Sequence, residues 1–197
     1  MDKPFSQACE NNKRPLLTVL REEFASVDFV LEVGAGTGQH AVFFAEQMPW
    51  LRWLPTDRAE NLPGIEAWRA YAALNNLLAP LELDVAGAAW PVNDVPAIFS
   101  ANTVHIMGWP EVERFFAAIG KHLRKGGVFC LYGPFNYGGE YTSASNAQFD
   151  QWLRGRDPRS GIRDFEALDE LARDAGLALH ADHAMPANNR TLVWRRS

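Results

Sequence analysis

The chain has 197 residues, of which 47% are hydrophobic, which is enough for one α/β domain with a continuous core. Its formal net charge of -5 argues against a large nucleic-acid surface, because such surfaces depend on clustered Lys and Arg. No apolar run approaches the roughly 20 residues of a membrane span, and residues 1–4 show no secretory signal pattern, so we expect a cytoplasmic protein that acts without nucleic acid or membrane.

Along the first half of the chain, apolar strand-like runs alternate with amphipathic helical stretches. This alternation is typical of a sheet wound by βαβ units. A first helix is predicted to begin at Pro15, because proline suits the first helical turn, and to end near Phe24. The expected elements that follow are a strand at 29–33, a helix at 39–48, a strand at 53–56, a helix at 65–74 and a strand at 81–83.

The second half continues the same alternation. Ser145 and Gln148 have capping-box spacing for a helix that runs to 154. Asp164 can cap the last helix, which Gly176 ends. Residues 133–144 are rich in Gly, Tyr and Ser, and we expect a loop there. The other expected elements are a strand at 97–101, a helix from 110 to between 121 and 125, a strand at 128–132, and two final strands at 177–184 and 191–195.

The most informative motif, EVGAGTG at residues 32–38, lies between an expected strand and an expected helix. Glycines let the backbone turn sharply and let a ligand approach it. A dinucleotide fingerprint of the form G-x-G-x-x-G fails here, because Gln39 stands where its third glycine belongs. A glycine-rich turn without a ligand is the plain alternative. The pattern that does stand, acidic-x-G-x-G-x-G, resembles the class I methyltransferases, which bind S-adenosylmethionine.

This resemblance implies a Rossmann-like α/β fold whose sheet is mostly parallel, with an antiparallel last strand and helices on both faces. The whole of residues 1–197 forms one domain in this interpretation, and residues 1–25 are a helical segment over the cofactor site. S-adenosylmethionine is the implied cofactor. The residues of the motif that the resemblance assigns to the cofactor are Glu32, Gly34, Gly36, Thr37 and Gly38.

Two acids follow the second and third expected strands. Asp57 lies 19 positions after Gly38, where a carboxylate can accept hydrogen bonds from both hydroxyls of a ribose that has no 2′-phosphate. In the methyltransferases that this sequence resembles, the acid at the place of Asp84 accepts from the adenine amino group, and the next residue, here Val85, packs beside the ring. Both acids are open to the alternative of a simple turn former.

A narrower resemblance is carried by seven motifs spread over nearly the whole chain: NNKRP at 11–15, GTGQHA at 36–41, NTVHI at 102–106, YGPF at 132–135, SASN at 143–146, GIRD at 161–164 and MPANN at 185–189. Together they are similar to one small family of methyltransferase-like proteins long labelled a domain of unknown function. That family implies a fold and a cofactor more firmly than it implies a substrate.

Topology predicts where these motifs meet. Ligands of open α/β sheets bind at the carboxyl ends of the parallel strands, so the loops after those ends form the site. The segment that begins at Asn102 meets this condition and is expected to contact the cofactor. The hairpin after residue 184 and the start of the first helix should reach the same edge. Their candidate substrate-binding residues are Asn12, Lys13, Arg14, Asn188 and Asn189.

His105 is the candidate for acid–base work, because an imidazole can exchange a proton near neutral pH; a packed core histidine is the alternative. Tyr132 is the second catalytic candidate, through its hydroxyl, with core packing as the alternative. No metal is expected: Cys9 and Cys130 lie far apart as plain thiols, and the two histidines that flank Asp182 fall on opposite faces of a strand.

The sequence therefore predicts methyl transfer from S-adenosylmethionine to a small-molecule acceptor by a monomer or homodimer. Such a reaction mainly needs alignment of the reacting atoms, so a strong base is not strictly required. Two alternatives remain open: a catalytically silent S-adenosylmethionine-binding module that regulates a partner, and an NAD-dependent oxidoreductase. The polar groups expected at the mouth favour an enzyme, and Gln39 counts against NAD.

Overall fold

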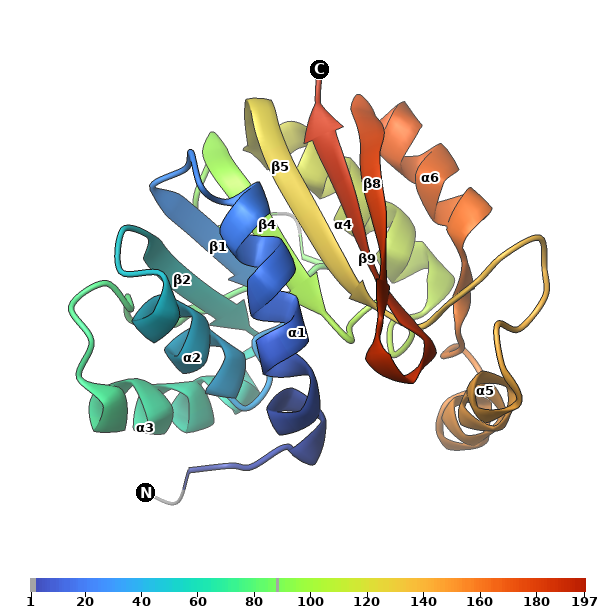
Figure 1. Ribbon diagram of the computed structural model, residues 1–197, viewed down its shortest axis with the longest axis horizontal. Helices are drawn as coiled ribbons and strands as arrows, with labels where there is room; N and C mark the ends of the chain where they lie inside the picture. Colours follow the sequence, from blue (N-terminus) through green and yellow to red (C-terminus); the bar gives the residue numbers. More distant parts are fainter. Residues whose placement is uncertain (1–2, 88) are drawn as a thin grey trace.

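The computed structural model describes residues 3–87 and 89–197. Its centre is a seven-stranded sheet with the order β3-β2-β1-β4-β5-β9-β8 (Figure 1). The strands are β1 (Phe29–Val33), β2 (Arg52–Asp57), β3 (Leu81–Glu82), β4 (Val95–Ala101), β5 (Leu123–Gly133), β8 (Leu177–Met185) and β9 (Asn189–Arg196).

Strand directions follow the predicted pattern. β1 pairs in parallel with β2 and β4, β2 with β3, and β4 with β5. β9 runs antiparallel to both of its neighbours, β5 and β8. The expected mostly parallel sheet with an antiparallel last strand is confirmed. Because β1, β2, β4 and β5 are parallel, their carboxyl ends lie at one edge, the lower edge in Figure 1.

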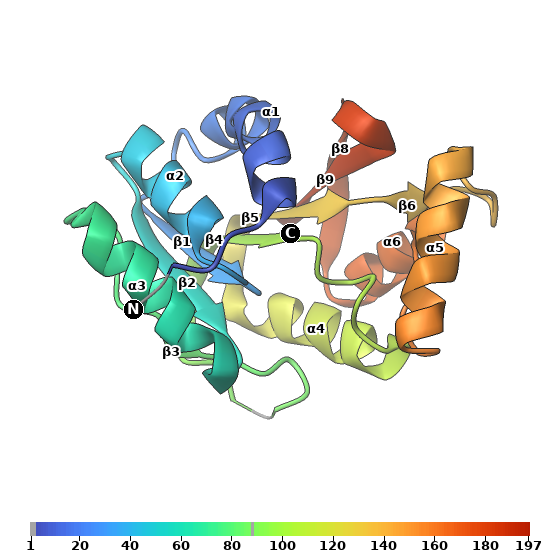
Figure 2. The ribbon, with the colours of Figure 1, turned by 90° about the horizontal axis from the view of Figure 1, so that it is seen from below.

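Helices cover both faces of the sheet. On one face lie α1 (Gln7–Glu23) and α2 (Gln39–Gln47), with α3 (Leu62–Ala72) beside α2, and on the other lie α4 (Trp109–His122) and α6 (Phe165–Asp174) (Figures 1 and 2). A hydrophobic core lies on each face of the sheet, and successive residues of a strand pack into opposite cores because their side chains point to opposite faces. Val30 packs among the α1 and α2 residues and Leu31 among those of α4 and α6.

The first helix begins earlier than the sequence predicted. α1 starts at Gln7, because the Ser6 side chain caps it by accepting from the Cys9 amide at 3.4 Å. Pro15, predicted as the helix start, lies inside the helix instead. A proline is favourable in the first turn of a helix and can also occur, at a cost in stability, in its interior. The local sequence pattern therefore did not distinguish these two positions for Pro15. The NNKRP motif is therefore part of the helix and does not precede it.

Smaller differences concern the segment between β5 and α6. α5 (Ala144–Arg156) is capped by Ser143, whose side chain accepts from the Asn146 amide at 3.1 Å, so the predicted Ser145 capping box was wrong. Asp164 stands at the N-cap of α6 but makes no side-chain capping bond. The expected loop at 133–144 contains β6 (Phe135–Asn136), which pairs in parallel with β7 (Arg163–Asp164). Two-residue strands leave no periodic signal in a sequence.

Two short 3-10 helices complete the chain, η1 (Ala59–Asn61) after β2 and η2 (Pro186–Asn188) between β8 and β9. Within residues 3–87 and 89–197, none of the helices combines the length and apolar character that crossing a membrane requires.

Candidate functional site

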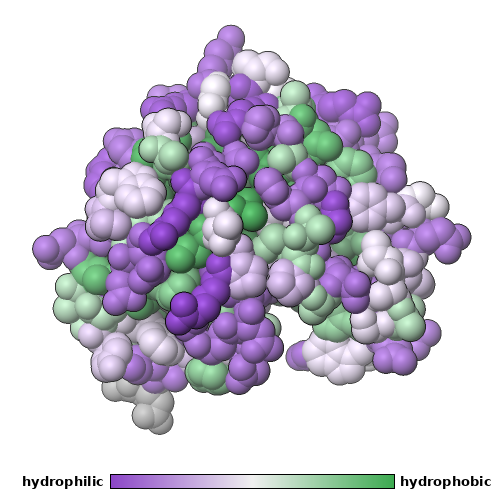
Figure 3. All heavy atoms as spheres, viewed as in Figure 1, coloured by the Kyte–Doolittle hydropathy of each residue, from purple (hydrophilic) through white to green (hydrophobic). Residues whose placement is uncertain are grey.

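The carboxyl edge of the sheet is where the predicted site residues gather. Figure 2 looks onto this edge and shows the start of α1 on one side and α5 on the other. Figure 3, in the view of Figure 1, shows that the surface is notched at the same edge, between α5 and the part of the molecule that carries α1 to α3.

The glycine motif forms the turn from β1 into α2. Gly34, Gly36 and Gly38 all have positive φ angles, of 77°, 58° and 87°. A Cβ on Gly34 would lie 2.5 Å from Thr103 Cγ2, and one on Gly38 would lie 2.9 Å from Ile65 Cα, so packing requires glycine at both places. A Cβ on Gly36 would meet nothing within 4 Å. The turn is therefore closely packed at its two ends and open in the middle.

Asp57, at the end of β2, lies directly against the open part of this turn. Its Oδ2 accepts from the Gly36 amide at 2.6 Å, and its Oδ1 accepts from the Arg58 amide at 2.8 Å and from Asn61 Nδ2 at 2.9 Å. A carboxylate offers about four acceptor sites. Asp57 is thus fixed in place, and about one acceptor site is left for a hydroxyl group of a ligand.

Glu32 is buried beneath the turn, with 1% of its surface exposed. One carboxyl oxygen accepts from Trp53 Nε1 at 2.7 Å. Removal from water raises its pKa from 4.5 to about 8, an effect that the Trp53 bond only partly offsets. In the ligand-free protein Glu32 is therefore mostly protonated at neutral pH. A cationic ligand beside it would favour the carboxylate form.

The stability of the protein should carry the signature of this shift. Because the pKa of Glu32 is raised from 4.5 to about 8 on folding, the folded chain binds this proton more tightly than the unfolded chain. The resulting contribution to the free energy of unfolding is complete below pH 4.5 and is lost as the pH rises through about 8. Between about pH 5 and about pH 9 we expect wild type to lose more free energy of unfolding than Glu32→Gln, whose amide stays neutral. Urea unfolding at both pH values checks this, and equal losses would contradict it.

The structure places the other cofactor candidates in different settings. Asp84, exposed in the turn after β3, accepts from the Ala86 amide at 2.9 Å, which is the geometry of a turn former. Val85 is partly buried against the α4 side of the core. Asn102 directly follows β4 in the left-handed region, with a φ of 59°, and its amide donates to the Tyr132 carbonyl at 2.8 Å. The ends of β4 and β5 are thereby joined.

Three substrate candidates lie within α1. Asn12 is buried and its Oδ1 lies 2.6 Å from His40 Nε2, so His40 carries the proton on Nε2 because an amide oxygen only accepts. Asn12 also lies beside the Tyr132 hydroxyl, and burial raises the pKa of that hydroxyl. Lys13 pairs with Glu10 at 2.5 Å, and Arg14 is exposed. Asn12 thus links α1 to α2 and β5, a contact the sequence did not predict.

His105 is buried in the loop after β4, with 4% of its surface exposed. Its ring meets Phe149 of α5 edge-on at 5.3 Å. Within the described part of the chain, Nδ1 has no hydrogen-bond partner. Burial, with a smaller contribution from nearby Arg163, lowers its pKa to about 4. The imidazole is therefore neutral at neutral pH and keeps a free lone pair.

The GIRD motif holds the loop that carries His105. Arg163 donates to the carbonyls of Val104 and Met107, at 3.1 Å for the first. The Gly161 amide donates to the His105 carbonyl at 2.9 Å. Adjacent residues complete the contact: Ser160 Oγ donates to the Ile106 carbonyl at 3.2 Å, and buried Asp150 of α5 accepts from the Ile162 amide at 2.7 Å. Four consecutive carbonyls of the His105 loop are thus fixed by one segment.

The hairpin between β8 and β9 brings Asn188 and Asn189 to the same edge. The Asn188 carbonyl accepts from Asn146 Nδ2 of α5 at 3.1 Å, while Asn189 Nδ2 bonds within the hairpin. Among the residues that the structure describes, the side-chain amide of Asn188 makes no hydrogen bond. A depression of about 390 Å³ opens here, lined by Tyr137, Thr142, Ala184, Met185, Asn188, Asn189 and Arg190.

Comparison with known proteins decides the family. Residues 3–196 match the model described as "Protein of unknown function (DUF938)". The chain belongs to this family. The family name assigns no activity, which agrees with the motif-based resemblance to a methyltransferase-like family of unassigned function.

Solved structures similar to this DUF938 chain establish the fold class. An O-methyltransferase family 2 protein from Planctomyces limnophilus, in complex with apigenin, is 16% identical, with a TM-score of 0.85 over 96% of this chain and 58% of its own. An O-methyltransferase family protein from Burkholderia thailandensis is 16% identical, with a TM-score of 0.83 over 94% and 56%. Human N-acetylserotonin methyltransferase, in complex with SAM, is 14% identical, with a TM-score of 0.80 over 97% and 53%.

The DUF938 chain thus spans little more than half of the length of these neighbours. At such low identity the likeness shows the fold, which is the Rossmann-like class I methyltransferase fold, as predicted.

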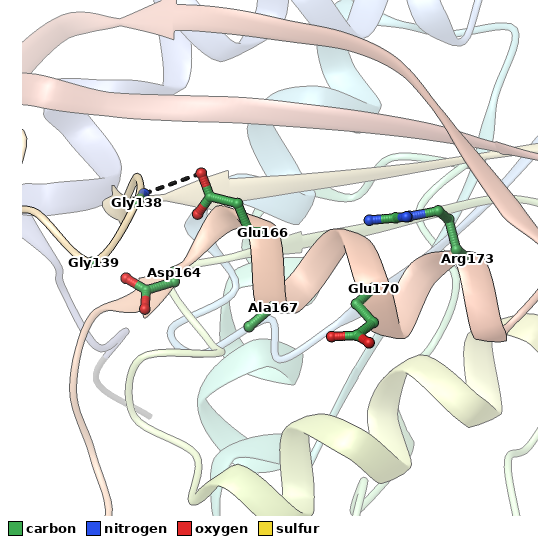
Figure 4. A pocket seen from close by; sticks show the side chains of 7 residues that line it. All are labelled: Gly138, Gly139, Asp164, Glu166, Ala167, Glu170 and Arg173. Atoms are coloured by element: carbon green, nitrogen blue, oxygen red, sulfur yellow. Dashed lines mark hydrogen bonds between the residues drawn. The ribbon is translucent and has the colours of Figure 1, made fainter.

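A second depression on the DUF938 chain lies along α6 and the turn at Gly138 (Figure 4). Glu166 accepts from the Gly138 amide at 3.1 Å, while Asp164, Glu170 and Arg173 are strung along the helix rather than aimed at one point. None of the predicted site residues lines it. The candidate site is therefore the notch, where the predicted residues lie.

Sequence reasoning missed two residues that organise the site. From the sequence, Gln39 was only the residue that breaks a dinucleotide fingerprint, and no role was assigned to Arg163. Both stand in motifs that carried the family resemblance, GTGQHA and GIRD, and those motifs were the signal that could have found them.

Proposed function

We propose that this protein binds S-adenosylmethionine at the glycine turn and transfers its methyl group to a small-molecule acceptor. The observation that carries the proposal is the Asp57 carboxylate, held 2.6 Å from the Gly36 amide at the open centre of the turn. A nucleoside ribose needs such an acid beside a backbone it can approach closely. The methyltransferase fold of the solved neighbours supports the choice of cofactor.

The residues present fit this cofactor. The backbone at Gly36 faces open space that any larger side chain would fill. Asp57 would accept from a ribose hydroxyl, and buried Glu32 would face positive charge. The remaining binding candidates are Gly34, Thr37, Gly38, Asp84, Val85 and Asn102. When bound, S-adenosylmethionine supplies a methyl group on a positively charged sulfur, which is transferred to a nucleophile.

On the acceptor side, the chain offers two catalytic candidates. Neutral His105 can take the proton that the acceptor loses as it attacks. The Tyr132 hydroxyl, beside Asn12, can position the nucleophile. Lys13, Arg14, Asn188 and Asn189 are the candidates for holding the acceptor. The acidic net charge of -5 favours a small molecule over nucleic acid.

Isotope-labelled S-adenosylmethionine, incubated with the protein and a metabolite extract, tests the reaction. We expect a labelled small molecule, detected by mass spectrometry, that is absent when Asp57→Ala replaces the wild-type protein. Tight binding of the cofactor without any labelled product would contradict methyl transfer and indicate a silent binding module instead.

Asp57→Ala should weaken S-adenosylmethionine binding by roughly 1.5–3 kcal/mol, or at least about tenfold, because charge-assisted bonds to the ribose are lost. Calorimetry measures the affinity. The matched control is Asp174→Ala, which removes an exposed carboxylate at the end of α6 and should bind as wild type does. Normal binding by Asp57→Ala would mean that the ribose is held elsewhere.

A further inference from the structure

The two halves of α1 are attached to the protein in different ways. In the second half, Leu16 and Leu20 are fully buried in the core between α1, α2 and the sheet. In the first half, Gln7 and Asn11 are exposed. Pro15 lies between the halves and has no N–H, so the Asn11 carbonyl lacks its usual helical partner. The helix is weakest at the junction, which is where a hinge would form.

One side chain, Gln39, joins the first half of α1 to the glycine turn. It is 4% exposed. Its Oε1 accepts from the Ser6 amide at 2.5 Å and from Thr37 Oγ1 at 3.1 Å, and its Nε2 donates to Glu10 Oε1 at 2.9 Å. The start of α1 is therefore attached to the turn through hydrogen bonds that meet at a single amide.

The segment before α1 extends this cover. Figure 2 shows it crossing the carboxyl edge from α3 to α1. The Pro4 carbonyl accepts from Trp68 Nε1 at 2.7 Å, and the Lys3 ammonium lies 2.9 Å from the centre of the Tyr71 ring. Phe5, in contrast, is 64% exposed and contributes little buried surface. Few apolar contacts need to break for this segment to lift.

We propose that residues 3–12 form a gate over the cofactor turn, which bends at Pro15 and is held closed by the hydrogen bonds of Gln39 and by the bond between Asn12 and His40. Gln39 is a positioning residue: it fixes the gate and does not touch the methyl group. The cofactor part of this inference rests on the proposed function. The gate itself rests on contacts within the chain.

Cys9 is a native reporter of the gate. It stands in the first turn of α1, its side chain is partly buried toward Ser6 and Thr37, and burial raises the pKa of its thiol. Cys130 in β5 is fully buried and serves as the internal reference. Alkylation of each cysteine by iodoacetamide, followed over time by mass spectrometry of the ligand-free protein, reports how often the gate opens.

Two single variants should move this rate in opposite directions. Gln39→Ala removes the hydrogen bonds that hold the gate closed. We therefore expect Cys9 to be alkylated about tenfold faster, with the rate at Cys130 unchanged. Pro15→Ala restores the missing helical hydrogen bond at the hinge and should slow Cys9 several-fold. Glu46→Ala, at an exposed position near the far end of the same helix as Gln39, is the control and should react as wild type does. Equal Cys9 rates in all four proteins would overturn the gate.

Exchanging the donor and the acceptor of the bond between Gln39 and Glu10 separates a specific role of this bond from a general loss of stability. Gln39→Glu alone loses the donor to Glu10 and sets two carboxylates against each other, so Cys9 should become reactive. Adding Glu10→Gln restores the pair with the roles reversed, and the Cys9 rate should return toward that of wild type. Failure of this rescue in a double variant with a wild-type melting temperature would overturn the role of Gln39.

Stopped-flow displacement of S-adenosylmethionine by S-adenosylhomocysteine tests what the gate controls. Gln39→Ala should raise the dissociation rate about tenfold, and Pro15→Ala should lower it. Unchanged dissociation rates in variants whose Cys9 reactivity changes would overturn the gate's role in cofactor exchange. If the cofactor does not bind at all while Cys9 responds as expected, the gate stands and the proposed function fails.

Discussion

Gly36→Val is expected to abolish S-adenosylmethionine binding while the protein stays folded. A Cβ at this position meets nothing within 4 Å, so the fold has room for it, although a φ of +58° strains a branched residue by about 1–3 kcal/mol. The added methyl groups occupy the open space beside Asp57 that the cofactor needs. Calorimetry with S-adenosylmethionine measures the binding, and a thermal melt confirms the folded state.

Gly138→Val is the matched control for this prediction. Gly138 has nearly the same φ, +59°, and an equally open Cβ position, but it lies on the turn beside α6. Backbone strain is thus the same in the two variants, and only the location differs. Unchanged cofactor affinity in Gly36→Val would refute the site, and equal loss in both variants would trace the effect to strain.

His105→Ala is expected to lower turnover by roughly a hundredfold or more at nearly constant cofactor affinity, if His105 takes the proton of the acceptor. The labelled acceptor from the extract screen serves as substrate. Because burial lowers the pKa of His105 to about 4, the base stays unprotonated above that pH. Wild-type activity should therefore persist as the pH falls to about 5 and decline only as it approaches the pKa.

His122→Ala provides the control for loss of a buried imidazole. His122 ends α4, stacks on Trp90 at 5.1 Å and lies away from the notch. Both variants should lower the melting temperature, because each leaves a cavity. Only His105→Ala should lower the turnover of the folded protein. Full activity in stably folded His105→Ala would remove the general-base role and leave alignment as the principal catalytic device.

The sequence predicted the parts of the fold and site that depend on local pattern and strand order. Alternation of apolar residues located the strands, and the rule for carboxyl ends assigned Gly36 and Asp57 to the same edge of the sheet, where the structure has them in contact. The start of α1 was mispredicted because Pro15 satisfies a helix-start rule, whereas the true cap, Ser6, precedes two turns without an apolar stripe.

The contacts that organise the site could not be predicted in the same way. Gln39 meets Glu10 across 29 positions, and Arg163 meets the Val104 carbonyl across 59. Such pairs depend on how helices and loops pack against the sheet, and no periodicity or spacing encodes them. The sequence marked these residues only through motifs of the family.

Binding of S-adenosylmethionine at the glycine turn is tested most directly by calorimetric titration of the ligand-free protein, with NAD titrated in parallel. We expect a single saturable site for S-adenosylmethionine and no heat of binding for NAD. Binding of NAD in place of S-adenosylmethionine, or of neither, would contradict the proposed cofactor.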